Sequence, residues 1–480
     1  MKKNISETKK GNNASSNKKE FKAFKNYPVF QYHFLFLFIG LFFGLKLVYV
    51  NPPWQTNDED RHFYNAYALL KGYISPQIEN GKIGYPMPTN LIETVRSFQG
   101  FPFSNTNLLS KEKINSRENQ PLNAKKLSFC DTPSAGILPF PYIPSAIMIK
   151  IGSIFKSSPI WLGWWGRICS LLAYLAIVFI AIKNIPHFKA ILMVIALSPM
   201  ALYQGASVSY DALSFALLFL LFSLVIKYYY QETPITLKQV LLFFLIAFAQ
   251  KCSKDGYFIA YFTLFAINIK KFESKKVYFL AGLLLLVASF LPSYLWNSYI
   301  GSLHLPAGKF QVDFKFDSAL NIKYHLNDPI NTISVLIQNI FNQGKTWIGS
   351  SIGRFGYSYT LFPDWIIILQ LSVYSLVVFF EKPSKLLSLK FRTVLLLFAF
   401  INVFSLVAAG LLLISPVGAN YIFGMQGRYF TPLLPFLFLG LFYMPFFEDR
   451  EKLLKWIVPI YCMVILFYTA DFLDSKFFAI

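Results

Sequence analysis

Charged residues are scarce in this sequence. Asp, Glu, Lys and Arg together make up 14% of the 480 residues, while hydrophobic residues make up 55% and aromatic residues 18%. A soluble domain usually has about 25% charged residues, so most of this protein's surface cannot face water. The scarcity of charge excludes a soluble catalytic protein and predicts an integral membrane protein.

Cysteine is also rare. The sequence contains four, far apart, and none has the spacing of a zinc site or of a disulfide framework. We therefore expect ordinary core residues at these positions: Cys130, Cys169, Cys252 and Cys462.

Acidic residues are few beside basic ones, at 24 against 45, which gives a net charge of +21. The lysines gather in the first 25 residues and in alternate loops between apolar runs. Cytoplasmic flanks of membrane proteins collect Lys and Arg, so the N-terminus is expected in the cytoplasm and some contact with anionic lipid is expected too. No basic and aromatic module typical of nucleic-acid binding accompanies this charge, so we expect no nucleic-acid partner.

Residues 1–30 form a polar segment rich in Asn, Lys and Ser, which predicts a disordered basic cytoplasmic tail. The long apolar stretch after it lacks the small-residue pattern of a cleavage site. This stretch is expected to remain as the first membrane anchor.

Apolar runs long enough to span a bilayer, which needs roughly 20 helical residues, recur through the rest of the chain. They predict an all-α polytopic membrane protein of about eleven spanning helices, with a single transmembrane domain over residues 31–480. One apolar region, Val240–Ile269, is interrupted by polar residues and predicts a helical hairpin. The other runs are Phe34–Val50, Trp161–Ile182, Ala190–Ala206, Leu213–Ile226, Val277–Trp296, Trp365–Phe380, Val394–Ile414, Leu433–Phe447 and Ile457–Phe472.

Two long polar segments fall on the outer side in this topology, residues 51–138 and 297–363. The first is expected to carry short interfacial helices over a cavity at the outer face. The second is expected to carry an amphipathic helix on the membrane surface. Its glycine-rich end, residues 348–359, is expected to be a mobile lid or an acceptor-binding loop, with Arg354 as a second phosphate contact or as part of a plain flexible loop.

An acidic cluster opens the first outer segment. In a helix, Asp58 or Glu59 would share one face with His62, because residues three or four apart are neighbours. Carboxylates this close to lipid are unfavourable unless they are paired, bound to metal or in a wet cavity. The alternative is a solvated, charge-paired start of the loop.

Charges also occur at three other outer helix ends. They are Asp211, the pair Lys251 and Lys254, and Arg428 beside Tyr429. Each alone is typical of an interfacial anchor. Together they could line one cavity for an anion such as a lipid-linked phosphate, which suits Lys and Arg.

Four segments in this order, PPWQTNDEDRHFYNAY, SVSYDALSFALLFL, KDGYF and QGRYFTPLLPF, resemble a bacterial membrane family called domain of unknown function 2142. The likeness extends from about Leu47 to Pro445. That family is grouped with the GT-C superfamily of polytopic glycosyltransferases. The resemblance implies a GT-C-like bundle in the bacterial inner (cytoplasmic) membrane that takes a sugar from a polyprenyl-phosphate donor at the outer leaflet.

The resemblance also implies roles for the acidic cluster. Asp58 is the first candidate for the catalytic acidic residue and Glu59 the second, with His62 as a supporting residue. A divalent metal, Mg or Mn, held by Asp58 and Glu59 is left open, because oxygen ligands suit these ions.

The donor-binding side follows from the family's Gln-Gly-Arg-Tyr motif, which matches Gln426, Gly427, Arg428 and Tyr429. Arg428 is the expected contact of the donor phosphate, helped by Lys251 or Lys254, and Asp211 is expected among the substrate-binding residues. The Trp-Trp-Asp motif of oligosaccharyltransferases is absent, so protein N-glycosylation is not expected.

The sequence thus predicts a glycosyltransferase that modifies a cell-envelope polysaccharide or glycolipid. Two other functions stay open. A transporter or flippase of a lipid-linked sugar would need charges near the middle of its helices, where the sequence shows few. An inactive scaffold in envelope assembly is the third.

Overall fold

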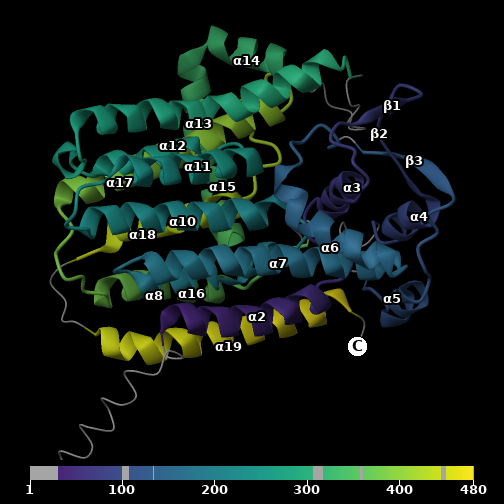
Figure 1. The fold of residues 1–480 in the computed structure, drawn as a ribbon, viewed down its shortest axis with the longest axis horizontal. Helices are drawn as coiled ribbons and strands as arrows, with labels where there is room; N and C mark the ends of the chain where they lie inside the picture. Colours follow the sequence, from purple (N-terminus) through teal and green to yellow (C-terminus); the bar gives the residue numbers. More distant parts are fainter. Residues whose placement is uncertain are drawn as a thin grey trace, which may run out of the picture.

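The computed structural model of the protein describes residues 31–99, 108–132, 134–305, 317–356, 360–444 and 450–478. Most of them are helical, and the long helices run roughly side by side across Figure 1. The buried apolar side chains of the described residues form one continuous core. The disordered tail predicted for residues 1–30 lies outside the described residues.

The helices keep the order of the chain. The α-helices are α2 (Tyr32–Val50), α3 (Glu59–Leu70), α4 (Thr89–Ser97), α5 (Lys111–Glu118), α6 (Ile143–Ile154), α7 (Pro159–Asn184), α8 (Lys189–Ala196), α9 (Pro199–Gly205), α10 (Tyr210–Tyr230), α11 (Leu237–Ser253), α12 (Phe258–Tyr261), α13 (Lys275–Ser302), α14 (Ser318–Asn327), α15 (Pro329–Gly353), α16 (Asp364–Phe380), α17 (Leu389–Ala409), α18 (Leu434–Phe442) and α19 (Glu451–Phe477). The short 3-10 and π turns are η2 (Phe140–Tyr142), η3 (Phe262–Ala266), η4 (Ile269–Lys271), η5 (Gly410–Ile414) and η6 (Gly427–Leu433).

Six helices of the described chain are long and apolar enough to cross a membrane. These are Tyr32–Val50, Pro159–Asn184, Tyr210–Tyr230, Lys275–Ser302, Leu389–Ile414 and Lys452–Phe477. Three shorter apolar helices, Phe140–Ile154, Asp364–Phe380 and Gly427–Phe442, accompany them. The expected number of about eleven spanning helices is therefore not confirmed.

Several apolar runs are divided, which explains the smaller number. The run over residues 190–206 breaks between α8 and α9, where the Ser198 side chain accepts a hydrogen bond from the backbone N–H of Ala201 and Pro199 opens α9. The hairpin expected over residues 240–269 has one full arm, α11. Its second arm consists of the four-residue α12 and the 3-10 turn η3.

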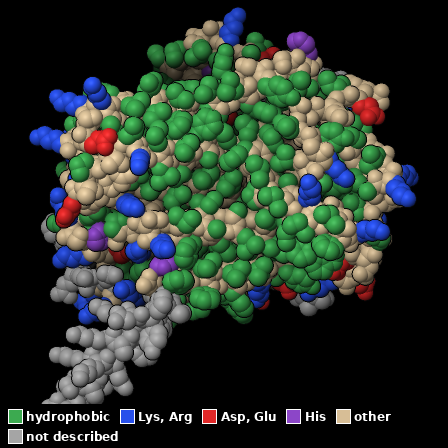
Figure 2. Space-filling view, viewed as in Figure 1, with side chains coloured by type: hydrophobic (Ala, Val, Ile, Leu, Met, Phe, Trp, Pro, Cys, Tyr) green, Lys and Arg blue, Asp and Glu red, His purple; other side chains and the backbone are tan. Residues whose placement is uncertain are grey.

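The outside of the bundle is apolar. Figure 2 shows a broad band of hydrophobic side chains across the middle of one face, with Lys and Arg gathered toward its two ends. On α13, Phe279, Leu283, Leu286 and Phe290 are all exposed and follow a helical spacing. Such a surface suits contact with lipid tails.

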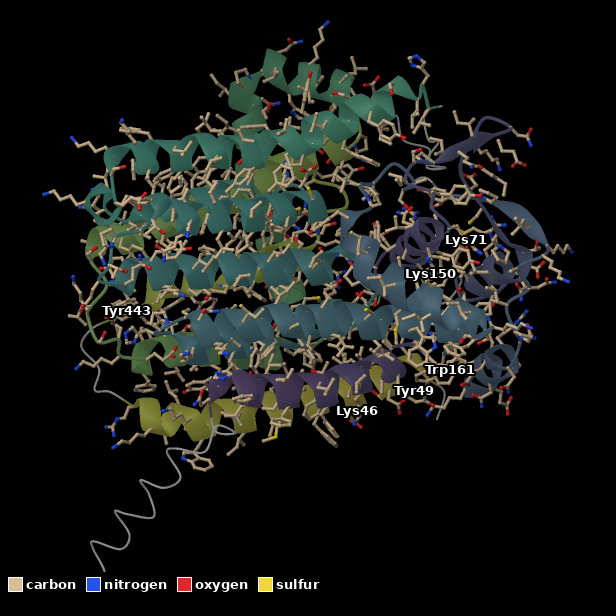
Figure 3. The ribbon with its side chains drawn as sticks, in the orientation of Figure 1. Lys46, Tyr49, Lys71, Lys150, Trp161 and Tyr443 are labelled. Atoms are coloured by element: carbon tan, nitrogen blue, oxygen red, sulfur yellow. The ribbon has the colours of Figure 1, made fainter. Side chains whose placement is uncertain are left out.

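Aromatic and basic side chains mark the two ends of the bundle (Figure 3). Tyr49 and Trp161 lie near the end that carries the first polar segment, and Tyr443 lies at the opposite end. Tyr49 and Trp161 are exposed, while Trp164 is buried. Trp161 thus suits a position at the membrane interface, whereas Trp164 is covered by neighbouring side chains, among them the Tyr49 ring.

The first polar segment contains a sheet that the sequence did not predict. Strands β1 (Gln77–Glu79), β2 (Lys82–Pro88) and β3 (Leu127–Asp131) pair antiparallel, with Tyr85 opposite Cys130. Helices α3, α4 and α5 belong to the same segment, at one end of the bundle in Figure 1.

The second polar segment is more ordered than expected. Its amphipathic part forms α14 and α15, and α15 continues through the glycine-rich sequence to Gly353, where Ser350 and Ser351 are buried. The prediction of a mobile lid or loop is wrong for residues 348–353, and its part over residues 357–359 lies outside the described residues. Arg354 lies next, in strand β4 (Arg354–Phe355), which pairs with β5 (Thr360–Leu361).

Candidate active site

The acidic cluster lies in a tight connection between α2 and α3. Pro52 and Pro53 follow the end of α2, and Trp54 and Asp58 both have a left-handed backbone, with φ of 57° and 60°. Asp tolerates this conformation better than most residues, whereas a bulky residue such as Trp rarely adopts it. The connection delivers Asp58 immediately before α3 with its side chain 34% exposed.

Glu59 is held by a buried arginine of α7. Its two carboxylate oxygens accept hydrogen bonds from Arg167 Nε at 2.7 Å and Nη2 at 2.6 Å. The backbone N–H groups of Val208 and Thr56 donate to the same carboxylate. Glu59 is 1% exposed, so its oxygens are committed to these partners and it anchors the start of α3.

Arg167 also closes the end of α2. It donates hydrogen bonds to the backbone carbonyls of Val48, Asn51 and Pro52 at 2.6 to 2.9 Å. The last carbonyls of a helix have no partner within the helix, so a buried guanidinium satisfies them. Arg167 and Glu59 together therefore set the position of the connection that carries Asp58.

Asp58 and three further charged side chains form a row of alternating sign. Asp58 Oδ2 lies 3.4 Å from Arg428 Nη2, and Arg428 Nε lies 3.3 Å from Asp211 Oδ2. Asp211 Oδ1 lies 2.5 Å from Lys254 Nζ. We call Asp58, Arg428, Asp211 and Lys254 the charged row. Only Asp58 at its end is substantially exposed.

The Gln-Gly-Arg-Tyr motif is fixed against the end of α15. A Cβ on Gly427 would lie 1.8 Å from the carbonyl oxygen of Trp347, so only glycine fits there. The backbone N–H of Gly427 donates to Ser350 Oγ at 3.0 Å. Gln426 accepts a hydrogen bond from Asn57 at 2.9 Å, which joins this motif to the acidic connection and aims Arg428 at Asp58.

Aromatic rings enclose Lys254. Its ammonium lies 4.6 Å from the centroid of the Tyr210 ring and 4.0 Å from that of Tyr429, both within the range of a cation–π contact. Burial lowers the pKa of Lys254 to about 8, against the opposite pull of Asp211. Lys254 is therefore charged at pH 7 and loses its proton only in mildly alkaline solution.

His62 lies beside the charged row in α3. Its Nδ1 is 2.7 Å from the Tyr142 hydroxyl, and its ring packs edge-on against Tyr210. Burial lowers the pKa of His62 to about 4, although nearby carboxylates, Asp58 first, oppose the shift. The imidazole is neutral at pH 7, and its buried Nε2 has no hydrogen-bond partner in the described chain.

The two buried arginines differ in how tightly they are held. The side-chain contacts of Arg167 lie between 2.6 and 2.9 Å. The contacts of Arg428 with Asn57, Asp58 and Asp211 lie between 3.3 and 3.5 Å. Charge-assisted hydrogen bonds of this kind are usually about 2.7–2.9 Å long. Arg428 therefore has capacity for a further anion, and Arg167 does not.

The structure separates the two lysines expected near the donor. Lys254 belongs to the charged row, whereas Lys251 pairs with Asp255 at 2.5 Å and lies over the Phe258 ring. The expected residues that come together at the row are Asp58, His62, Asp211, Lys254, Gln426, Arg428 and Tyr429.

A family model described as a predicted membrane protein (DUF2142) matches residues 41–437. The chain belongs to this family. The resemblance carried by the four sequence segments is thereby confirmed, and so is the membrane character of the chain. No match was found among curated proteins or among solved structures.

Three residues of this DUF2142 site were not predicted from the sequence: Arg167, Tyr142 and Tyr210. Arg167 had a usable signal, because a charged residue inside an apolar run normally has a buried partner or a function. Tyr142 and Tyr210 gave no signal of their own, since tyrosine is frequent throughout the chain.

The same DUF2142 connection does not suit a metal held by Asp58 and Glu59. Glu59 is bound to Arg167, while Asp58 faces Arg428 and Arg61, so the two carboxylates serve different partners. Within the described ranges, no group of three or more His, Cys, Asp or Glu side chains is placed to hold a metal ion.

Proposed function

We propose that this DUF2142 protein is a GT-C-like glycosyltransferase of the bacterial inner membrane, with its N-terminus in the cytoplasm. It moves a sugar from a polyprenyl-phosphate donor to a cell-envelope polysaccharide or glycolipid at the outer face. The observation that carries the proposal is the contact of Asp58, a partly exposed carboxylate, with Arg428, a buried and loosely held arginine.

The chemistry needs a base and a cation side by side. The acceptor hydroxyl oxygen attacks the anomeric carbon of the donor sugar, and the bond from that carbon to the phosphate oxygen breaks. The phosphate leaves with the bonding electron pair, and Asp58 takes the hydroxyl proton. Arg428, backed by Lys254, stabilises the charge that develops on the leaving phosphate.

The charged row suggests an order of binding. Before substrate arrives, Asp58 and Arg428 neutralise each other, so neither is ready to act. A donor phosphate that takes over the guanidinium of Arg428 releases the Asp58 carboxylate. The acceptor hydroxyl is therefore activated only after the donor is in place.

His62 and Tyr142 act as positioning residues in this proposal. Their hydrogen bond and the packing of His62 on Tyr210 support the wall of the site beside the charged row. The neutral imidazole adds no positive charge that would compete with Arg428 for the phosphate.

A transfer assay tests the proposal. Purified protein is incubated with radiolabelled undecaprenyl-phosphate sugars and a membrane extract that supplies acceptors. Label should move to a new product with wild type and not with Asp58→Asn. Asp131→Asn is the matched control, because Asp131 is also partly exposed in the first polar segment, where it pairs with Lys82.

Three outcomes are distinguishable. Transfer by wild type and by Asp131→Asn, with none by Asp58→Asn, supports the proposal. Equal transfer by Asp58→Asn refutes the role of Asp58. No transfer from any donor by folded wild type refutes the transferase and favours a transporter of lipid-linked sugars or an assembly scaffold.

A further inference from the structure

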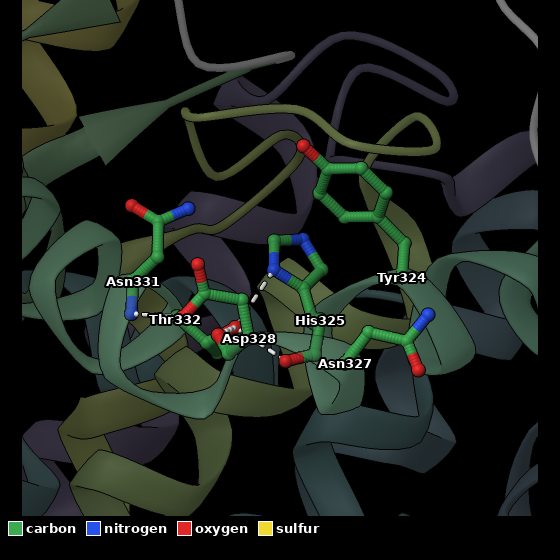
Figure 4. A pocket seen from close by; sticks show the side chains of 6 residues that line it. All are labelled: Tyr324, His325, Asn327, Asp328, Asn331 and Thr332. Atoms are coloured by element: carbon green, nitrogen blue, oxygen red, sulfur yellow. Dashed lines mark hydrogen bonds between the residues drawn. The ribbon is translucent and has the colours of Figure 1, made fainter.

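A second polar site lies at the corner between α14 and α15. The hollow there has a volume of about 220 Å³, and Figure 4 shows the side chains that line it. Its lining combines an aromatic ring, a histidine, a carboxylate, two amides and a hydroxyl: Tyr324, His325, Asn327, Asp328, Asn331 and Thr332. None of these residues takes part in the charged row.

The corner is built by the start of α15. Asp328 caps this helix by accepting a hydrogen bond from the backbone N–H of Asn331. The Thr332 hydroxyl contacts two backbone carbonyls, those of His325 at 2.7 Å and Asp328 at 2.9 Å. These bonds fix the hollow's floor without using the side-chain amides of Asn327 and Asn331.

The contacts of Thr332 determine which nitrogen of His325 carries the proton. A carbonyl oxygen can only accept, so the single hydroxyl hydrogen of Thr332 is used on the carbonyls. The hydroxyl oxygen of Thr332 lies 3.1 Å from His325 Nδ1 and must accept a hydrogen bond from Nδ1–H. Burial lowers the pKa of His325, so the ring is neutral at pH 7 and its Nε2 is a bare acceptor.

This acceptor has no protein partner. His325 is 3% exposed, and its Nε2 is buried without a hydrogen bond in the described chain. A buried acceptor without a hydrogen bond is unfavourable, so a ligand that donates to it is favoured. Nε2 is turned toward the Tyr324 ring, and both side chains line the hollow.

We propose that the hollow binds a saccharide. A sugar offers hydroxyl donors for His325 Nε2 and the Asp328 carboxylate, and hydroxyl acceptors for the amides of Asn327 and Asn331. Its apolar face suits the ring of Tyr324. An anion would meet the carboxylate and the bare nitrogen, which both repel it, so the hollow does not suit a phosphate.

This site is separate from the proposed transferase site. Between Pro329 and Ser350, which contacts Gly427, α15 covers about 30 Å at about 1.5 Å per residue. A saccharide in the hollow would therefore lie far from the charged row. A long glycan could bind the hollow with one part while another part reacts at the charged row. Binding there does not depend on transferase activity.

Nitrogen-15 NMR of histidine-labelled protein tests the proposal, since the chain has only five histidines. The protein is kept in a detergent without a sugar headgroup, and His325→Gln assigns the signal. Methyl glycosides of glucose, galactose, mannose and N-acetylglucosamine are added to about 100 mM, because a few hydrogen bonds give millimolar affinity. At least one should shift the Nε2 signal of His325.

Variants of the lining place the binding in the hollow. Asn331→Ala and Tyr324→Ala should each weaken the affinity about fivefold, the effect of losing roughly 1 kcal/mol. Lys323→Ala, on the same helix but outside the lining, should leave it unchanged. No shift with any of the four glycosides overturns the proposal, and so does equal binding by wild type and both lining variants.

Discussion

Glu59 and Arg167 form a doubly hydrogen-bonded ion pair with side chains only 1% and 2% exposed, across 108 positions of the sequence. The pair joins the start of α3 to the first half of α7. Since Arg167 also satisfies carbonyls at the end of α2, three elements depend on one guanidinium. The position of Asp58 is thus decided by residues that take no part in the proposed chemistry.

Glu59→Gln should destabilise the protein by about 3 to 5 kcal/mol, because it leaves the buried charge of Arg167 without a counter-charge. Thermal unfolding in detergent measures the change. Asp131→Asn breaks the exposed pair with Lys82 and should cost less than about 1 kcal/mol. Equal melting temperatures for the two variants would contradict a structural role of Glu59.

Asp58→Asn should keep the melting temperature of wild type, since Asn tolerates the left-handed backbone at this position, where φ is 60°. Asp58→Val should lower stability by about 1–2 kcal/mol, because a β-branched residue is strained there. The two variants separate backbone strain from loss of the carboxylate. If both unfold at the same temperature, the backbone at Asp58 is not the constraint we describe.

Gly427→Ala should cost about 1–3 kcal/mol and move Arg428 away from Asp58, because the added methyl group collides with the Trp347 carbonyl. Gly344→Ala is the matched control. A Cβ at Gly344 has open space around it, and alanine favours the helical state of α15. That variant should be as stable as wild type or more so, by thermal unfolding. An unchanged melting temperature in Gly427→Ala would contradict the close approach.

Stability should fall as the pH drops from about 6.5 toward 4. The pKa of His62 is lowered in the folded protein to about 4, so between these values the unfolded chain binds the extra proton. The difference between the two pKa values corresponds to at most about 3.4 kcal/mol. His62→Gln should reduce the slope of melting temperature against pH, whereas His304→Asn, at an exposed position, should not. An unchanged slope in His62→Gln would rule out His62 as the titrating group.

Affinity for a polyprenyl phosphate should decline above pH 8. Lys254, whose pKa burial lowers to about 8, then loses the charge that backs Arg428. Lys254→Arg should bind phosphate with little decline up to pH 9.5 or so, because arginine stays protonated. Binding is measured by titration of undecaprenyl phosphate into protein in lipid nanodiscs. Parallel declines in wild type and Lys254→Arg would place the titrating group elsewhere.

Composition and local pattern alone predicted much of this protein. The scarcity of charge and the apolar runs indicated a membrane protein, and four short segments in order indicated its family. The same segments contained Asp58, Asp211, Lys254 and Arg428, which the structure brings into one row. Local signals sufficed because hydropathy and short motifs are properties of neighbouring residues.

Tertiary structure decided the rest. Hydropathy did not reveal that the run over residues 190–206 divides at Ser198, or that the glycine-rich sequence stays helical to Gly353. Hydropathy also could not show that Lys251 and Lys254, three positions apart, pair with different carboxylates. Glu59 and Arg167 show the physical reason: a buried charge is stable only beside its partner, and packing between distant helices determines which partner that is.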